Sequence, residues 1–224
     1  MIDQLIIGEK ASYADFSASV ASRTIGLPAK KVIKETVPFS NKTYDFSGIN
    51  GEVYWEEREL EYVFEILADN PQMLEDQKQA FADWIMNVEE EQIFDPFIPD
   101  YHFIGTYSEM DFEDDETLIK TTATVTFTAY PYKIANHPSV SVYSIAAGAT
   151  AAVLAQNQSS HRILPTLEVD GSVRIEYNGV TFTASAGTYS SETFMLDPGA
   201  NVLTVTNQSD AECSLKISFT EEVF

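Results

Sequence analysis

Every second residue between Leu60 and Ile66 is large and apolar, whereas most of the positions beside them carry glutamate. The apolar set is Leu60, Tyr62, Phe64 and Ile66, and the glutamates are Glu59, Glu61 and Glu65. Because successive side chains of a strand point to opposite faces, this alternation predicts a strand over residues 59–67 with one face on a core and the other in water. Residues 122–130 alternate in the same way, with threonines sharing one face.

A helical period follows the first of these strands. Pro71 comes directly after Asp69 and Asn70, and either of those residues can cap a helix whose first turn tolerates proline. Apolar side chains then recur at helical spacing, namely Leu74, Phe81, Trp84, Ile85 and Val88. This stripe predicts one helix that docks on a sheet through a single face.

Weaker patterns predict further strands at residues 5–7, 30–38, 92–97 and 101–106. Residues 12–22 are mostly small and polar and are expected to form a loop and then a strand. The acidic run at residues 110–116 is predicted to be an exposed turn, and residues 48–51 form a second predicted turn.

The pattern changes after Pro131 and Pro138, where prolines and polar residues break any regular element. A domain junction is therefore expected near residues 133–139, giving domains at 1–134 and 139–224. The second part is almost purely β, with a hairpin signal at Asn178-Gly179 and a turn signal at residues 197–199. The chain is predicted to be mainly β, with a β-sandwich or split barrel carrying one α-helix, followed by a β-sandwich of the jelly-roll type.

The composition adds a strong negative charge: the 224 residues carry a net charge of -22. Such a surface repels polyphosphate and anionic lipid, which disfavours nucleic-acid or membrane binding as the main task. The charge serves either solubility or a specific electrostatic role. The single cysteine, Cys213, cannot form an intrachain disulfide, as expected of a protein folded in a reducing cytoplasm. The sequence has neither a secretory signal nor an apolar run of membrane-spanning length.

The residue patterns favour no catalytic or metal site. Glu56-Glu57 and Asp114-Asp115-Glu116 could offer the acidic residues of a glycosidase, but those enzymes need two carboxylates facing each other across a sugar. Solvated turn residues are the simpler interpretation. The three histidines are far apart in sequence and lack metal-ligand spacing. We therefore expect a protein that is not an enzyme and has no cofactor or metal.

Aromatic residues gather around the predicted turn at residues 48–51, namely Tyr44, Phe46, Tyr54 and Trp55. Such side chains either fill the core of the first domain or lie exposed in a protein interface, with sugar stacking as a third use.

The segment Tyr44-Asp45-Phe46-Ser47-Gly48, followed by Gly51, Tyr54, residues 57–60 and residues 62–66, resembles the distal tail protein family of long-tailed siphophages and related prophages. The same order of elements continues through the helix around Trp84 to Tyr130-Pro131-Tyr132, which closes the first domain in relatives. The resemblance covers residues 6–133. Beyond them, residues 165–169 and the Asn178-Gly179 hairpin resemble the galectin-like C-terminal domain of that family. Residues 39–42 depart from it, because many relatives have a glycine-rich turn there.

The resemblance implies a structural protein of the virion tail tip, assembled in the cytoplasm of the bacterial host. Its first domain would form a ring, usually hexameric, that joins the tail tube protein to a tail-associated hub or lysin protein. Its galectin-like domain would point outward and, in some phages, hold a receptor-binding protein. No cofactor or reaction is implied. The candidate subunit-interface residues are Tyr44, Phe46, Tyr54, Trp55 and Arg58.

A different class of function remains open, in which the second domain is a carbohydrate-binding module for adsorption to the host. His161-Arg162 is the nearest approach to a sugar-binding pair in that domain, and it stands alone in the sequence. A fold by itself does not imply sugar binding, because function depends on the site that the fold carries.

Overall fold

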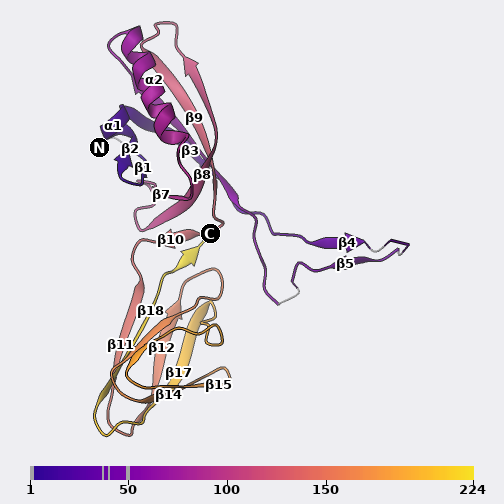
Figure 1. Ribbon diagram of the computed structural model, residues 1–224, viewed down its shortest axis with the longest axis vertical. Helices are drawn as coiled ribbons and strands as arrows, with labels where there is room; N and C mark the ends of the chain where they lie inside the picture. Colours follow the sequence, from indigo (N-terminus) through magenta and orange to yellow (C-terminus); the bar gives the residue numbers. More distant parts are fainter. Residues whose placement is uncertain (1–2, 37, 40, 49–50) are drawn as a thin grey trace. The chain divides into compact units, whose positions relative to one another are not determined.

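The computed structural model describes residues 3–224 except residues 37, 40, 49 and 50. The fold is mainly β, as predicted, and the chain divides into two compact units (Figure 1). Unit 1 comprises residues 1–133 and Phe224, and unit 2 comprises residues 134–223. Each unit has its own hydrophobic core, and each is described separately below.

Unit 1 is built on one antiparallel sheet with the strand order β2-β1-β7-β8-β9-β6-β3. Its strands are β1 (Ile6–Ile7), β2 (Lys10–Ala11), β3 (Ala18–Ile25), β6 (Arg58–Leu67), β7 (Glu91–Phe94), β8 (Tyr101–Asp114) and β9 (Lys120–Ala129). The alternation in β6 is confirmed, since its apolar side chains are buried. Arg58, which opens the strand, lies on the same buried face.

The predicted helix is α2 (Pro71–Ile85). Asn70 is its amino-terminal cap, because the Asn70 side chain accepts a hydrogen bond of 2.9 Å from the backbone N–H of Met73. A second, short helix, α1 (Ser12–Phe16), replaces the loop that we expected near residue 12. It forms because Ser12 is fully buried and its hydroxyl accepts a hydrogen bond of 3.0 Å from the N–H of Leu5, which fixes the chain locally.

Aromatic rings join the two helices to the sheet of unit 1. Phe81 of α2 is fully buried and meets Phe64 of β6 edge to face, with ring centroids 5.1 Å apart. Trp84 stacks on Phe16 of α1 at 4.6 Å. These contacts place the stripe of α2 over the core face of β6, as the sequence predicts.

Two predicted elements are wrong. Residues 110–114 are not a turn but the end of β8, which pairs with β9 as far as Asp114 and Thr121. Met110 and Phe112 pack partly against the core while the acidic side chains between them stay exposed, so the carboxylates mark a solvent face. Among the described residues of the range 30–38, β4 (Lys34–Thr36) is the one strand, and Lys30 makes an isolated bridge.

Three further predictions concern one strand and two turns, and their outcomes differ. The expected strand at residues 92–97 is shorter, because β7 ends before Asp95. The predicted turn at residues 48–51 includes two residues outside the described ones, although Gly51 N–H donates to Gly48 O at 2.9 Å. The turn at Asn178-Gly179 is confirmed by positive φ angles of 46° and 79° at the two residues.

Unit 2 contains two four-stranded sheets, ordered β11-β18-β13-β16 and β12-β17-β14-β15. The strands are β11 (Ser139–Ile145), β12 (Thr150–Asn157), β13 (Thr166–Val169), β14 (Val173–Tyr177), β15 (Val180–Ala184), β16 (Gly187–Tyr189), β17 (Gly199–Asn207) and β18 (Cys213–Phe219). Two short strands, β10 (Lys133–Ala135) and β19 (Glu222–Val223), pair with each other. Alternating residues of both sheets face a common core, as expected for a sandwich.

Buried asparagines hold the loops of unit 2. Asn201 is 2% exposed, and its side-chain amide donates to the backbone oxygens of Asp197 and Gly199 at 2.8 and 3.0 Å. Its side-chain oxygen accepts a hydrogen bond of 2.9 Å from the N–H of Asp197. The turn predicted at residues 197–199 is therefore fixed by a side chain from the strand that follows it.

We expect Phe81→Ala to lower the free energy of unfolding of unit 1 by about 3–5 kcal/mol, because it leaves a cavity among Phe16, Phe64 and Trp84. Met86→Ala is the matched control, since Met86 is 57% exposed at the end of the same helix. Urea denaturation followed by tryptophan fluorescence measures both, because Trp84 reports on this core. A loss below 1 kcal/mol for Phe81→Ala would show that the helix is not held by this cluster.

The ion pair between Lys78 of α2 and Asp114 of β8 makes stability depend on pH. Its Nζ–Oδ2 distance is 2.9 Å, and the hydrogen bond lowers the pKa of Asp114 and raises the pKa of Lys78. The contribution of Asp114 is complete above its unfolded pKa near 3.8 and is lost as the pH falls through the lower folded pKa. The contribution of Lys78 is complete below 10.5 and is lost as the pH rises through the raised pKa.

We expect Asp114→Asn to cost about 0.5 kcal/mol at pH 7 and almost nothing at pH 2, because the pair is near the surface. Asp111→Asn on the same strand is the control, since Asp111 is exposed and makes no ion pair within the described residues. Chemical denaturation across the pH range tests this. An equal loss at pH 2 and pH 7 would contradict the role of the ion pair.

Candidate subunit interface

A two-stranded arm, defined as residues 26–57, projects from unit 1 at the edge of its sheet (Figure 1). It continues the pairing of β3 with β6 beyond the sheet, through hydrogen bonds of Gly26 N–H to Glu59 O and of Glu56 N–H to Ala29 O. Its outer part is the hairpin of β4 and β5 (Thr43–Asp45). A Cβ atom on Gly26 would lie 2.9 Å from Glu59 O, so glycine is needed where the arm leaves the sheet.

The arm is a ribbon of two strands, and its large apolar side chains are exposed. The exposed set is Leu27, Val32, Ile33, Phe39, Tyr44, Phe46, Val53 and Tyr54. Phe39, between β4 and β5, is fully exposed. Many exposed apolar side chains on one segment are typical of a surface that becomes buried against another molecule.

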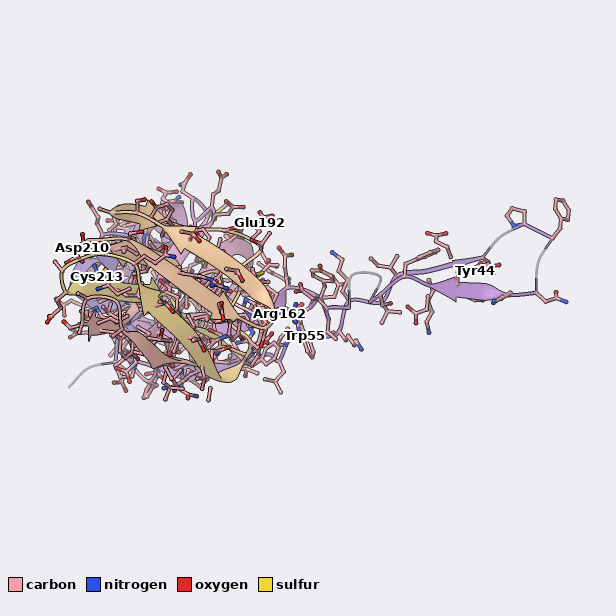
Figure 2. The ribbon with its side chains drawn as sticks, turned by 90° about the horizontal axis from the view of Figure 1, so that it is seen from below. Tyr44, Trp55, Arg162, Glu192, Asp210 and Cys213 are labelled. Carbon is pink, nitrogen blue, oxygen red and sulfur yellow. The ribbon has the colours of Figure 1, made fainter. Side chains whose placement is uncertain are left out.

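Three of the five candidate residues lie exposed on this arm. Tyr44 is 40%, Phe46 39% and Tyr54 44% exposed. Figure 2 shows Tyr44 on the projecting strand and Trp55 near the base of the arm. These three side chains of the aromatic group therefore do not fill the core of unit 1, and they stay candidates for an interface or for sugar stacking.

Trp55 and Arg58 differ from the other three candidates. Trp55 is half-buried, and its ring meets the ring of Phe224 edge to face at 4.7 Å within unit 1. Arg58 is 2% exposed, and its Nε and Nη2 atoms have no hydrogen-bond partner among the described residues. Its guanidinium lies over the ring of Phe103 at 5.7 Å, and burial lowers the pKa of Arg58.

Most of the apolar residues of the arm are not among the candidate interface residues drawn from the sequence. The alternation that marks a half-buried strand does not extend over Leu27, Val32 and Ile33, because a free two-stranded ribbon has no buried face to impose it. Phe39 belongs to residues 39–42, the segment that departs from the glycine-rich turn of the family that the sequence resembles, and that departure is a signal that could have identified it.

The arm also differs in charge from the rest of the chain. Residues 30–46 carry four lysines and two carboxylates, hence a net charge of 4 − 2 = +2, in a chain whose net charge is -22. The lysines are Lys30, Lys31, Lys34 and Lys42. Residues 26–57 as a whole carry four lysines and five carboxylates, 4 − 5 = −1, so the positive charge is confined to residues 30–46 of the arm. A net basic, apolar stretch on an acidic protein is electrostatically complementary to the body of another copy.

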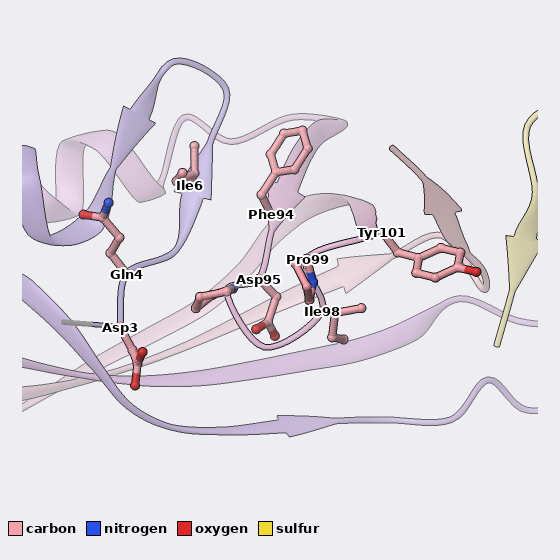
Figure 3. Close-up of a pocket in the computed structure, with 9 residues that line it drawn as sticks. Asp3, Gln4, Ile6, Phe94, Asp95, Ile98, Pro99 and Tyr101 are labelled. Carbon is pink, nitrogen blue, oxygen red and sulfur yellow. The ribbon is translucent and has the colours of Figure 1, made fainter. Parts of the chain in front are cut away.

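A pocket of about 290 Å³ in unit 1 lies beside the segment that follows β7 (Figure 3). Asp95 is its buried carboxylate, and it already accepts hydrogen bonds from Arg23, from the Tyr62 hydroxyl at 3.0 Å and from Phe97 N–H at 2.9 Å. Burial raises the pKa of Tyr62, so its hydroxyl stays protonated and donates to Asp95. Asp95 thus acts as a structural group that holds the segment after β7.

The other candidate groups are accounted for within each unit. His161 pairs with Glu222 at 3.3 Å and Arg162 with Asp197 at 2.7 Å, so both side chains of the possible sugar-binding pair are engaged in unit 2. Cys213 is buried, and burial raises the pKa of its thiol. Over the described residues, no group of three metal-ligating side chains occurs, and no helix is both long and apolar enough to cross a membrane.

No protein-family model and no curated protein sequence matches the chain. Among solved structures, it is similar to the baseplate of phage P2 in its activated conformation with Ca, with 8% identity over 96% of this chain and 98% of the other. The TM-score of 0.38 is too low to support an argument.

A stronger similarity is to the crystal structure of the Dit protein (gp 19.1) of SPP1, described as a paradigm of the hub adsorption apparatus in phages that infect Gram-positive bacteria. The two chains share 12% identity, and the match covers 98% of this chain and 99% of Dit with a TM-score of 0.67. This match spans both units. The chain therefore has the fold of a phage distal tail protein, and the resemblance drawn from its sequence is confirmed at the level of the fold.

Proposed function

We propose that this chain is a structural component of a phage-type tail tip or baseplate, and that it is not an enzyme. The observation that carries the proposal is the fold shared with SPP1 Dit over almost the whole of both chains. A fold alone does not determine a function, and a structural role in a tail tip also requires a surface suited to assembly. The arm of unit 1 provides such a surface.

The finer proposal is a ring, usually of six subunits in the family that the sequence resembles, built by unit 1. In a closed ring, one surface of each subunit meets a different surface of the next. The arm supports this arrangement, because its exposed apolar side chains and its net charge of 4 − 2 = +2 over residues 30–46 suit the acidic body of a neighbouring copy. The ring would link the tail tube protein to the tail-associated hub or lysin protein.

Unit 2 then has a peripheral role in this proposal. It would point away from the ring as the galectin-like domain of the family does, and would carry a receptor-binding protein. The carbohydrate-binding alternative has less support, because His161 and Arg162 are already paired with Glu222 and Asp197. A glycan array probed with the full chain distinguishes the two proposed roles of unit 2, which are to carry a receptor-binding protein and to bind carbohydrate.

The test of the proposed function is the solution mass of the full chain, followed by negative-stain imaging of any large species. A closed ring with a central channel wide enough for duplex DNA is the expected result when the chain is mixed with its tube and hub partners. A chain that remains monomeric with those partners present would overturn the ring.

We expect the double variant Phe39→Ala/Tyr44→Ala to weaken ring assembly at least tenfold without lowering stability, because both side chains are exposed in the isolated chain and buried in the ring. Leu118→Ala, at a 52% exposed residue of the turn between β8 and β9, is the matched control. Sedimentation velocity gives the assembly and thermal unfolding gives the stability. If the double variant assembles like Leu118→Ala, the arm is not the contact.

Arg58→Met tests whether the buried arginine costs stability in the isolated chain. An unpaired buried cation costs free energy, so we expect this variant to raise the stability of the isolated chain by about 1–3 kcal/mol. Urea denaturation measures the change, and a lower stability of Arg58→Met would contradict this expectation.

A further inference from the structure

One side of the unit 2 sandwich is formed by two edge strands that contain no charged residue. β11 ends the first sheet and β12 ends the second, and residues 146–149 connect them directly. Residues 134–161, which include both strands, contain no Asp, Glu, Lys or Arg, in a chain of which 21% is charged. Soluble proteins usually protect exposed edges with charges, prolines, bulges or short length, because an open edge pairs with other strands.

None of these protections is present in β12. The strand has 8 residues and pairs with β17 in an unbroken register from Thr150–Thr206 to Asn157–Gly199, without a bulge. β11, of 7 residues, is equally regular against β18. The edges at the opposite side of the sandwich are short, with 5 residues in β15 and 3 in β16. The protection by length thus applies to one side only.

The hydrogen-bond pattern shows which groups of β12 face the open edge. Asn207 N–H donates to Ala149 O, which makes residues 149, 151, 153 and 155 the ones bonded to β17. Ala152, Leu154 and Gln156 therefore turn their backbone N–H and C=O outward. The oxygen of Leu154 confirms this direction, because it accepts a hydrogen bond from the Tyr143 hydroxyl of β11 and not from β17. Among the described residues, the outward N–H groups of these three residues have no partner.

The side chains beside this edge are neutral and partly apolar. Leu154 is 48% exposed, and its cross-strand neighbour Val202 on β17 is 60% exposed. A partner strand added to β12 would bury both side chains and would satisfy the three N–H groups.

We propose that β12 pairs with β12 of a second copy of this chain, antiparallel and around a two-fold axis, so that the sheet β12-β17-β14-β15 continues from one copy into the other. Charge favours a second copy of this chain as the partner of β12. Two copies with a net charge of -22 each repel wherever their acidic surfaces meet, and a neutral side is where they approach at least cost. A basic partner would be attracted to the acidic surfaces instead. A strand that meets itself around a two-fold axis needs no second complementary surface.

This pairing does not use the arm, so it is independent of the proposed ring, and its two-fold symmetry allows it to join subunits of two rings. Single cysteines at Ala152, Leu154 and Gln156 of the full chain, tested one at a time under mild oxidation, measure the proximity of the two strands. Cys213 is buried, so the unchanged chain gives the background. Thr181→Cys and Thr183→Cys, both exposed on the opposite edge strand β15, are the matched controls.

The expected result is a disulfide-linked dimer at one or more of the three β12 positions, formed at least ten times faster than at either β15 position. Ala152→Asp should raise the dissociation constant of this dimer about tenfold, because it places one carboxylate of each copy in the new strand pair, where loss of hydration and repulsion between the copies both cost free energy. Thr181→Asp should leave it unchanged. Equal cross-linking on β12 and β15, or association unaffected by Ala152→Asp, would overturn the proposal.

The arm variant Phe39→Ala/Tyr44→Ala keeps this result separate from the ring. Cross-linking through β12 that persists in that variant supports strand pairing even where ring assembly is lost. Cross-linking that disappears with the arm would show that β12 meets its copy only as a consequence of the ring, and would overturn β12 as an independent contact.

Discussion

The burial of one face of β6 is the constraint on which unit 1 depends. That face holds Leu60, Tyr62, Phe64 and Ile66, all fully buried, and α2 docks on it through Phe81. β6 also lies between β9 and β3 in the sheet and extends beyond it into the arm. The same strand therefore anchors the helix, the sheet and the surface proposed for assembly. A shift of its register by one residue would turn the apolar face to water and the glutamates to the core.

Charge divides the surface of the molecule into regions with different uses. Most of the chain is acidic, whereas residues 30–46 of the arm are net basic and residues 134–161 carry no charge. Like charges keep copies apart wherever no specific contact exists, so these two exceptions are where contacts between copies cost least. The basic residues 30–46 suit an acidic neighbour, and the neutral edge suits a second copy of itself. The two surfaces lie in different units, which allows one chain to take part in two kinds of contact.

The buried polar side chains of the two units differ in whether their hydrogen bonds are satisfied. Asp95 and Asn201 are buried with their hydrogen bonds satisfied, and each fixes a loop. Arg58 is buried on the core face of β6 with two of its nitrogens unsatisfied. Unsatisfied buried cations are costly, so Arg58, in contrast to Asp95, is a side chain whose position the hydrogen bonds of the described residues do not explain.

The sequence alone determined β6, β9, α2 and the hairpin at Asn178-Gly179, because their patterns come from local rules: alternation, helical spacing, capping and positive φ. The tertiary structure decided three other features. It extended β8 through the acidic residues 110–114, since charges on the solvent face of a strand look like a turn in sequence. It separated Arg58 and Trp55 from the exposed aromatic residues, because burial depends on neighbours distant in the chain. It also made β12 an edge, a property of sheet order that no local pattern encodes.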